Sequence, residues 1–140
     1  MTATDPDRRW VIEITTGPQA LEDIHNMLDD LWSAHDDIPE LVRLHTDLAA
    51  GEIGANIIEH AGGGNPVRLS MEVQVLPDEI HITYTDDGRP ARVDLSATTM
   101  PDEMSERGRG LAIAVSVLDD LSYLHDSDGN HWTLVRRLAA

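Results

Sequence analysis

Three polar side chains spaced four residues apart are the first candidates for chemistry in this sequence. Glu52, Asn56 and His60 lie within residues 52–61 (EIGANIIEHA). In an α-helix this spacing places them on one face, over roughly 12 Å of helix axis. A carboxamide oxygen can ligate a hard cation such as Mg²⁺, and a carboxylate can orient or deprotonate an attacking hydroxyl. The pattern favours chemistry at a metal-bound phosphate, although the polar stripe of an ordinary amphipathic helix has the same spacing.

A second motif, residues 85–90 (TDDGRP), ends a predicted strand. Asp-Gly is a common turn dipeptide, so a tight turn is one interpretation. A carboxylate at a strand end is also a good acceptor for the exocyclic amine of adenine, and Gly88 would let the backbone approach a flat ring closely. Because side chains alternate along a strand, we expect Asp86 rather than Asp87 to face inward and bind the base.

A third motif, residues 107–110 (RGRG), precedes an apolar segment predicted to be a helix from 111 to 121. A glycine-rich turn before a helix N-terminus is a potential anion site, because free N–H groups and the helix dipole point at it. It is not the dinucleotide-binding fingerprint, which needs a preceding strand and a third glycine where Ile113 stands. A flexible joint is the plainer interpretation of such a pair of glycines.

Apolar periodicity predicts the elements that must position these motifs. The predicted strands are 10–15, 67–76, 80–85, 122–125 and 132–138, and the predicted helices are 18–34, 39–61 and 111–121. Residues 1–8 are predicted to be a disordered tail, and 9–140 a single domain. The order of elements predicts an α/β (α+β) two-layer sandwich, with the helices on one face of a mixed, mostly antiparallel sheet.

The composition narrows the classes of function. The formal net charge is −16 and all ten basic residues are arginines, so the surface does not suit nonspecific binding to nucleic acid or to an anionic membrane. The absence of lysine also excludes the phosphate-binding loop that depends on one. The absence of cysteine excludes disulfides, thiolate zinc sites and cysteine catalysis. With no apolar leader segment either, we expect a cytoplasmic protein.

In this order the three motifs resemble those of the GHKL (Bergerat-fold) ATPase superfamily. Residues 52–61 resemble its N box, 86–90 (D-x-G-x-P) its first glycine motif, and 108–111 (G-x-G-L) its second. The resemblance covers residues 10–138. Within the superfamily, the compact length, the DDGxP form and the closing 133–138 (TLVRRL) resemble the anti-sigma-factor serine/threonine kinases, the RsbW-like group.

The resemblance implies a role for each matched position. Glu52 would act as the base toward a substrate hydroxyl, and Asn56 would ligate Mg²⁺ at the ATP phosphates. Asp86 would bind the adenine amine, with Gly88 packing under the ring. The remaining residues that the resemblance assigns to cofactor binding are Arg107, Gly108, Gly110 and Thr133.

These remaining assignments differ in kind. Gly108 and Gly110 would flank the phosphates at the end of a lid spanning roughly 91–107, and Thr133 would support Asp86 from the last strand. Lids of this family often carry a basic residue before the second glycine motif. Here Arg107 and Arg109 are both candidates to contact the γ-phosphate.

The resemblance further implies an ATP-binding anti-sigma factor with Mg²⁺-dependent serine/threonine protein kinase activity. Its phosphoacceptor would be an anti-anti-sigma protein and its client a sigma factor. Direct nucleic-acid or membrane binding is not expected, whereas a homodimer is. The alternative function is a module that senses ATP against ADP and sequesters a regulatory partner without transferring phosphate.

Overall fold

The computed structural model of the chain describes residues 8–91 and 106–139, with the backbone alone described for 106–108. The predicted tail, 1–8, therefore lies outside the described residues except for its last position. The same holds for most of the predicted lid, 91–107.

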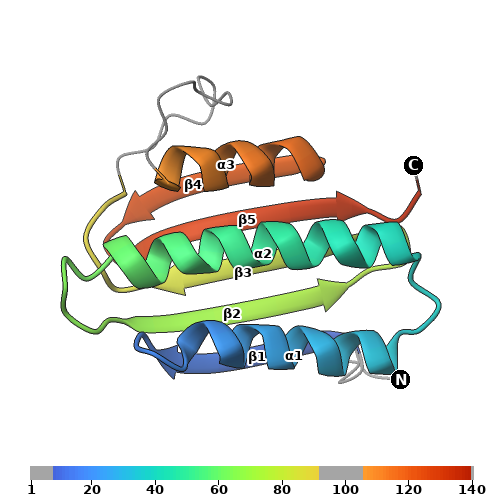
Figure 1. The fold of residues 1–140 in the computed structure, drawn as a ribbon, viewed down its shortest axis with the longest axis horizontal. Coiled ribbons are helices and arrows are strands. Elements are labelled where there is room, and N and C mark those ends of the chain that lie inside the picture. The colour runs from blue at the N-terminus through green and yellow to red at the C-terminus, as the bar shows by residue number, and fades with distance from the viewer. Residues whose placement is uncertain (1–7, 92–105, 140) are drawn as a thin grey trace.

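Within the described residues, five strands form a single sheet and three helices cover one of its faces (Figure 1). The strands are β1 (Arg9–Thr15), β2 (Arg68–Val75), β3 (Glu79–Asp86), β4 (Asp120–Asp126) and β5 (Gly129–Arg137). The helices are α1 (Ala20–Ala34), α2 (Glu40–His60) and α3 (Glu106–Val117). The predicted two-layer sandwich is confirmed.

The strand order is β1-β2-β3-β5-β4, and each of these neighbouring pairs is antiparallel. The sheet is therefore antiparallel throughout its described part, where the sequence predicts a mixed, mostly antiparallel sheet. Figure 1 shows α2 running lengthwise over the middle of the sheet, between α1 on the β1 side and α3 on the β4 side. This arrangement places the C-terminal half of α2 over the central strands β3 and β5.

Alternation along β3 decides which of its side chains face the helices. Ile80, Ile82, Tyr84 and Asp86 are buried, and the residues between them are only partly buried. Such a period of two is what a strand needs when one face packs on a helical layer. It carries Asp86, the last residue of the strand, to the helix-covered side of the sheet.

A buried hydrogen bond fixes α2 against β3 close to the polar stripe. The Tyr84 hydroxyl donates to the carbonyl oxygen of Ala50 at 2.7 Å. Burial raises the pKa of this hydroxyl, so it stays protonated and remains a donor. At Gly54, an added Cβ would lie 2.9 Å from Cδ1 of Ile24 on α1, so the two helices approach closely here. The segment of α2 that carries the polar stripe is therefore held firmly.

Helix α3 does not lie where the sequence predicts it. The predicted helix 111–121 begins five residues earlier in the structure, at Glu106, and ends at Val117. The glycines of the third motif accordingly lie in the first turns of the helix, not in a turn before it. The apolar run beyond Val117 enters β4 instead, because Leu121 pairs with Leu134 of β5. Cross-strand pairing therefore overrides the helical pattern at this end.

Among the described residues, no helix combines the length and the apolar character needed to cross a membrane.

Candidate functional site

A cavity of about 460 Å³ lies between the end of α2 and the ends of β3 and β5. Its lining residues are Asn56, Ile57, His60, Ala61, Asp86, Arg89, Pro90, Ala91, Asn130 and Trp132. This volume falls in the range of pockets for small molecules and cofactors. The cavity brings together Asn56 and Asp86, two residues that separate sequence motifs single out.

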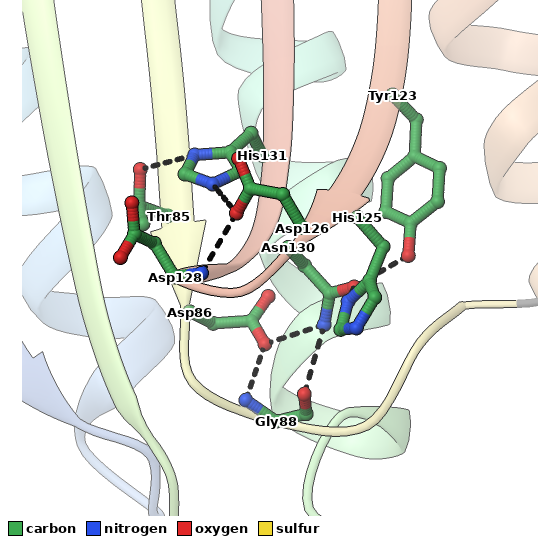
Figure 2. A network of polar contacts seen from close by, with 9 residues as sticks. All are labelled: Thr85, Asp86, Gly88, Tyr123, His125, Asp126, Asp128, Asn130 and His131. Atoms are coloured by element: carbon green, nitrogen blue, oxygen red, sulfur yellow. Dashed lines mark hydrogen bonds and ion pairs between the residues drawn. The ribbon is translucent and has the colours of Figure 1, made fainter.

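Asp86 lines this cavity and has one carboxylate oxygen without a hydrogen-bond partner in the described part of the chain. The side chain is 2% exposed, and its Oδ1 accepts hydrogen bonds from the Gly88 amide and from Asn130 Nδ2, both at 2.9 Å (Figure 2). Its Oδ2 is buried without a hydrogen-bond partner among the described residues. Such an orphan acceptor is costly in a folded protein, so a ligand that donates a hydrogen bond would be favoured here.

The neighbouring carboxylate faces the other way. Asp87 is exposed, and its Oδ1 accepts a hydrogen bond from the Arg68 amide at 2.8 Å. The inward orientation of Asp86 is thus the one that the alternation of the strand predicts. Its binding to adenine stays a prediction.

Gly88 is the point where the chain leaving β3 passes the end of α2. An added Cβ would lie only 2.4 Å from the carbonyl oxygen of Ala61, and that oxygen accepts a hydrogen bond from the Arg89 amide at 2.8 Å. Backbone this close excludes a side chain. The approach that requires glycine here is to the helix end, and the predicted packing of Gly88 under an adenine ring stays a prediction.

Gly88→Ala should therefore lower the free energy of unfolding by about 1–3 kcal/mol, because the methyl group collides with backbone that cannot rotate away. Urea unfolding followed by circular dichroism measures this change. Gly17→Ala is the matched control, since nothing lies within 4 Å of its Cβ position and no loss of stability is expected. Equal stability of the two variants would contradict the close approach at Gly88.

Asn56 contributes a second polar group without a partner. The residue is 7% exposed, and its Nδ2 is buried with no hydrogen-bond partner among the described residues. A carboxamide here can donate through Nδ2 to a phosphate oxygen and ligate a cation through Oδ1. The described residues hold no group of three or more acidic, histidine or cysteine side chains placed to bind a metal. A cation at Asn56 would thus take most of its ligands from phosphates and water, as Mg²⁺ commonly does.

Glu52 lies one turn before Asn56 on α2 and outside the cavity lining. Its half-buried side chain reaches α3, where Oε2 would be 2.5 Å from a Cβ added at Gly110. The absence of a side chain at Gly110 therefore makes room for this carboxylate between the two helices. The structure brings together Glu52 and Gly110, which were predicted from different motifs.

The prediction for Thr133 needs correction. The β3–β5 register pairs Thr133 with Thr83, whereas the residue opposite Asp86 is Asn130. Alternation places Thr133 on the sheet face that the helices do not cover. The support that the resemblance assigned to Thr133 is provided by Asn130, which lies between the predicted strands 122–125 and 132–138. Counting back in steps of two from the buried Trp132 would have placed Asn130 on the inward face.

Two further predicted residues are only partly described. The side chain of Arg107 and the surroundings of Gly108 lie outside the description, so their predicted contacts with phosphate are untested. Arg109, the alternative candidate, is exposed on α3. Arg89, which sequence analysis did not single out, lines the cavity, and its Nε donates to the carbonyl oxygen of His60 at 3.0 Å.

A separate polar cluster closes the β4–β5 hairpin on the uncovered face of the sheet (Figure 2). His131 Nε2 lies 2.9 Å from Asp126 Oδ1, and that oxygen also accepts from the Asp128 amide at 2.8 Å. The hydrogen bond from His131 lowers the pKa of Asp126. These contacts fix the turn of the β4–β5 hairpin.

A second hollow of about 460 Å³ is lined by residues of β1, β2 and β3 and by Asp87 and Asp128. Asp86 contributes to this lining as well, together with the acidic residues Glu13, Asp87 and Asp128 and the single arginine Arg68. This excess of negative charge would repel a polyphosphate. The cavity at Asp86 and Asn56 is the better candidate for an anionic nucleotide.

Fold and site together define a class of protein. A layer of three helices on an antiparallel sheet, with a buried strand-end carboxylate facing a cavity beside an asparagine-bearing helix, is the arrangement of a GHKL-type nucleotide-binding domain. The family model described as the histidine kinase-like ATPase domain matches residues 14–136, and the chain belongs to that family. The ligand implied by this membership is ATP.

A solved structure shows the same fold. The chain is similar to the histidine kinase domain from Erythrobacter litoralis EL346 blue-light activated histidine kinase, with a TM-score of 0.55 and 18% sequence identity. The similarity covers 83% of this chain and 61% of that one, so this chain spans about three fifths of its length. At this identity the comparison concerns the fold alone. A search of curated proteins gave no match.

Proposed function

We propose that this domain binds Mg²⁺–ATP in the cavity and transfers the γ-phosphoryl group to a serine or threonine hydroxyl of a partner protein. The observation that carries the proposal is the pairing on α2 of Asn56, which lines the cavity, with Glu52, which lies one turn earlier on the same helix. Phosphoryl transfer depends mainly on positioning and charge neutralisation, and a carboxylate that orients the attacking hydroxyl is one of its recurring parts.

The residues present fit this nucleotide. Asp86 Oδ2 is an orphan acceptor that the adenine amine would satisfy, and Asn56 Nδ2 is an orphan donor that a phosphate oxygen would satisfy. Mg²⁺, when bound, offsets the negative charge of the phosphates. Arg89 lines the same cavity and adds positive charge. Glu52 would hold or accept the proton of the incoming hydroxyl.

The partners in this proposal come from the resemblance to anti-sigma-factor kinases. They are an anti-anti-sigma protein as phosphoacceptor and a sigma factor as the sequestered client, which implies action in the cytoplasm. The proposal includes a homodimer through β1 and α1. Its support is that β1 is an edge strand, paired only with β2 within the described part of the sheet. An edge strand of this kind can pair with another chain.

One observation favours the alternative function, an ATP- and ADP-sensing module without phosphotransfer. The Glu52 carboxylate lies against Gly110 of α3, and this packing between the two helices needs no chemistry. In that case nucleotide binding would change the affinity for a partner, and no phosphate would move.

Incubation with γ-labelled ATP and candidate partner proteins separates the two functions. The kinase proposal predicts label on the partner that survives acid treatment, as serine and threonine phosphoesters do, whereas phosphohistidine is lost in acid. Partner binding that differs between ATP and ADP, with no transfer of label, would support the sensing module instead.

A further inference from the structure

We propose that Asn130, oriented by Tyr123 and His125 of the edge strand β4, sets the nucleobase selectivity of the cavity. It would do so by holding Asp86 with a single oxygen facing the ligand. This inference rests on the proposed nucleotide site and adds three positioning residues to it. Figure 2 shows these side chains converging at the end of β3.

The orientation of the Asn130 amide follows from its contacts. Its Nδ2 lies 2.9 Å from Asp86 Oδ1 and 2.8 Å from the carbonyl oxygen of Arg89, both of which are acceptors. Its Oδ1 accepts from the Tyr123 hydroxyl and lies 3.0 Å from His125 Nδ1. Only one placement of the amide oxygen and nitrogen satisfies this set, and it makes His125 Nδ1 a donor. Asn130 is 1% exposed, so water does not replace these partners.

The consequence for Asp86 is an asymmetric carboxylate. Both donors from the protein, the Gly88 amide and Asn130 Nδ2, go to Oδ1, and none among the described residues goes to Oδ2. The oxygen left for a ligand is therefore a pure acceptor. A purine with an amino group at position 6 pairs with it, whereas a purine without that group leaves it buried and unpaired. Sites built to hydrogen-bond one group discriminate strongly against ligands that lack it.

Tyr123 acts on this arrangement from outside the cavity. Its hydroxyl accepts a hydrogen bond from the Ala91 amide at 2.8 Å and donates one to Asn130. The hydroxyl is therefore occupied both as a donor and as an acceptor. Its ring packs on Trp132 with centroids 4.6 Å apart, and Trp132 lines the cavity. Tyr123 and His125 are not themselves among the lining residues. Any effect they have on a nucleotide must pass through Asn130 or through this packing.

The test compares the affinities of ATP and of purine riboside 5′-triphosphate, which lacks the 6-amino group, by calorimetry with Mg²⁺ present. The unmodified protein should prefer ATP by roughly 10-fold or more, as expected for a hydrogen bond to a charged acceptor. Asn130→Ala should reduce this preference by at least about 3-fold, and Tyr123→Phe, which keeps the ring packing on Trp132, by about 2-fold or more. Ser122→Ala, an exposed change on the same strand, should leave the preference unaltered.

The ratio of the two affinities distinguishes positioning from general structural support. A structural role would weaken both nucleotides equally, and an unaltered ratio in Asn130→Ala and Tyr123→Phe would overturn the inference. If Asn130→Ala does not fold, the ratio of the two affinities in Tyr123→Phe and in His125→Gln still distinguishes positioning from structural support. If the unmodified protein does not prefer ATP over purine riboside 5′-triphosphate, the assignment of Asp86 to the base is overturned as well. If the preference for ATP is unchanged in both Asn130→Ala and Tyr123→Phe, only the role of Asn130 is overturned.

Discussion

Replacing Glu52 with glutamine should reduce phosphotransfer by roughly 10²- to 10⁴-fold, the range expected when a general base is lost. Glutamine keeps the size of the side chain, so the contact with Gly110 on α3 is retained and only the charge and basicity disappear. Because Glu52 does not line the cavity, the dissociation constant for Mg²⁺–ATP should change by less than about 3-fold. Single-turnover transfer of label and calorimetry measure these two quantities.

Glu40→Gln is the matched control for this substitution. Glu40 is the exposed first residue of the same helix, at the end away from the cavity, and its replacement removes the same charge. It should leave both transfer and binding near normal. Normal turnover in Glu52→Gln would remove Glu52 from the mechanism and favour the sensing module.

Asp86→Asn should weaken Mg²⁺–ATP binding by roughly 30-fold or more. The Gly88 amide and Asn130 Nδ2 both require an acceptor at the inner oxygen position, so the new carboxamide must turn its oxygen toward them. Its NH₂ group then faces the cavity and meets the amine of adenine, donor against donor. The substitution removes a hydrogen bond to a charged group and leaves an unpaired buried donor, which together cost about 2 kcal/mol or more. Calorimetric titration with Mg²⁺–ATP measures the loss.

Asp87→Asn tests whether this loss is local to the cavity. The two carboxylates are adjacent in sequence, but Asp87 is exposed and accepts from the Arg68 amide. Its replacement removes the same formal charge without touching the cavity, and the affinity for ATP should stay within about 2-fold of normal. Equal losses in the two variants would indicate a long-range charge effect and not a contact with the base.

Local periodicity was sufficient to predict much of the site. Glu52 and Asn56 share a helix face because their spacing matches the helical repeat, and Asp86 faces inward because side chains alternate along a strand. Both rules depend only on neighbouring residues. They hold here because tertiary packing agrees with the local pattern along α2 and β3.

The parts that sequence analysis missed depend on contacts between distant segments. Asn130 supports Asp86 through the β3–β5 register, which no local pattern specifies. Gly88 is required by the end of α2, which the chain meets only after folding. Helix α3 begins before the glycines of the third motif, although glycine is a weak helix former. At Gly110 the absence of a side chain leaves space for Glu52. Packing against α2 is the physical reason that such a helix start is tolerated.

A crystal structure of the protein with Mg²⁺ and a non-hydrolysable ATP analogue would show where the nucleotide binds. We expect the purine amine within hydrogen-bond distance of Asp86 Oδ2, and the phosphates and the metal ion on the Asn56 side of the same cavity. A nucleotide bound in the second hollow, or a purine amine directed away from Asp86, would contradict this expectation.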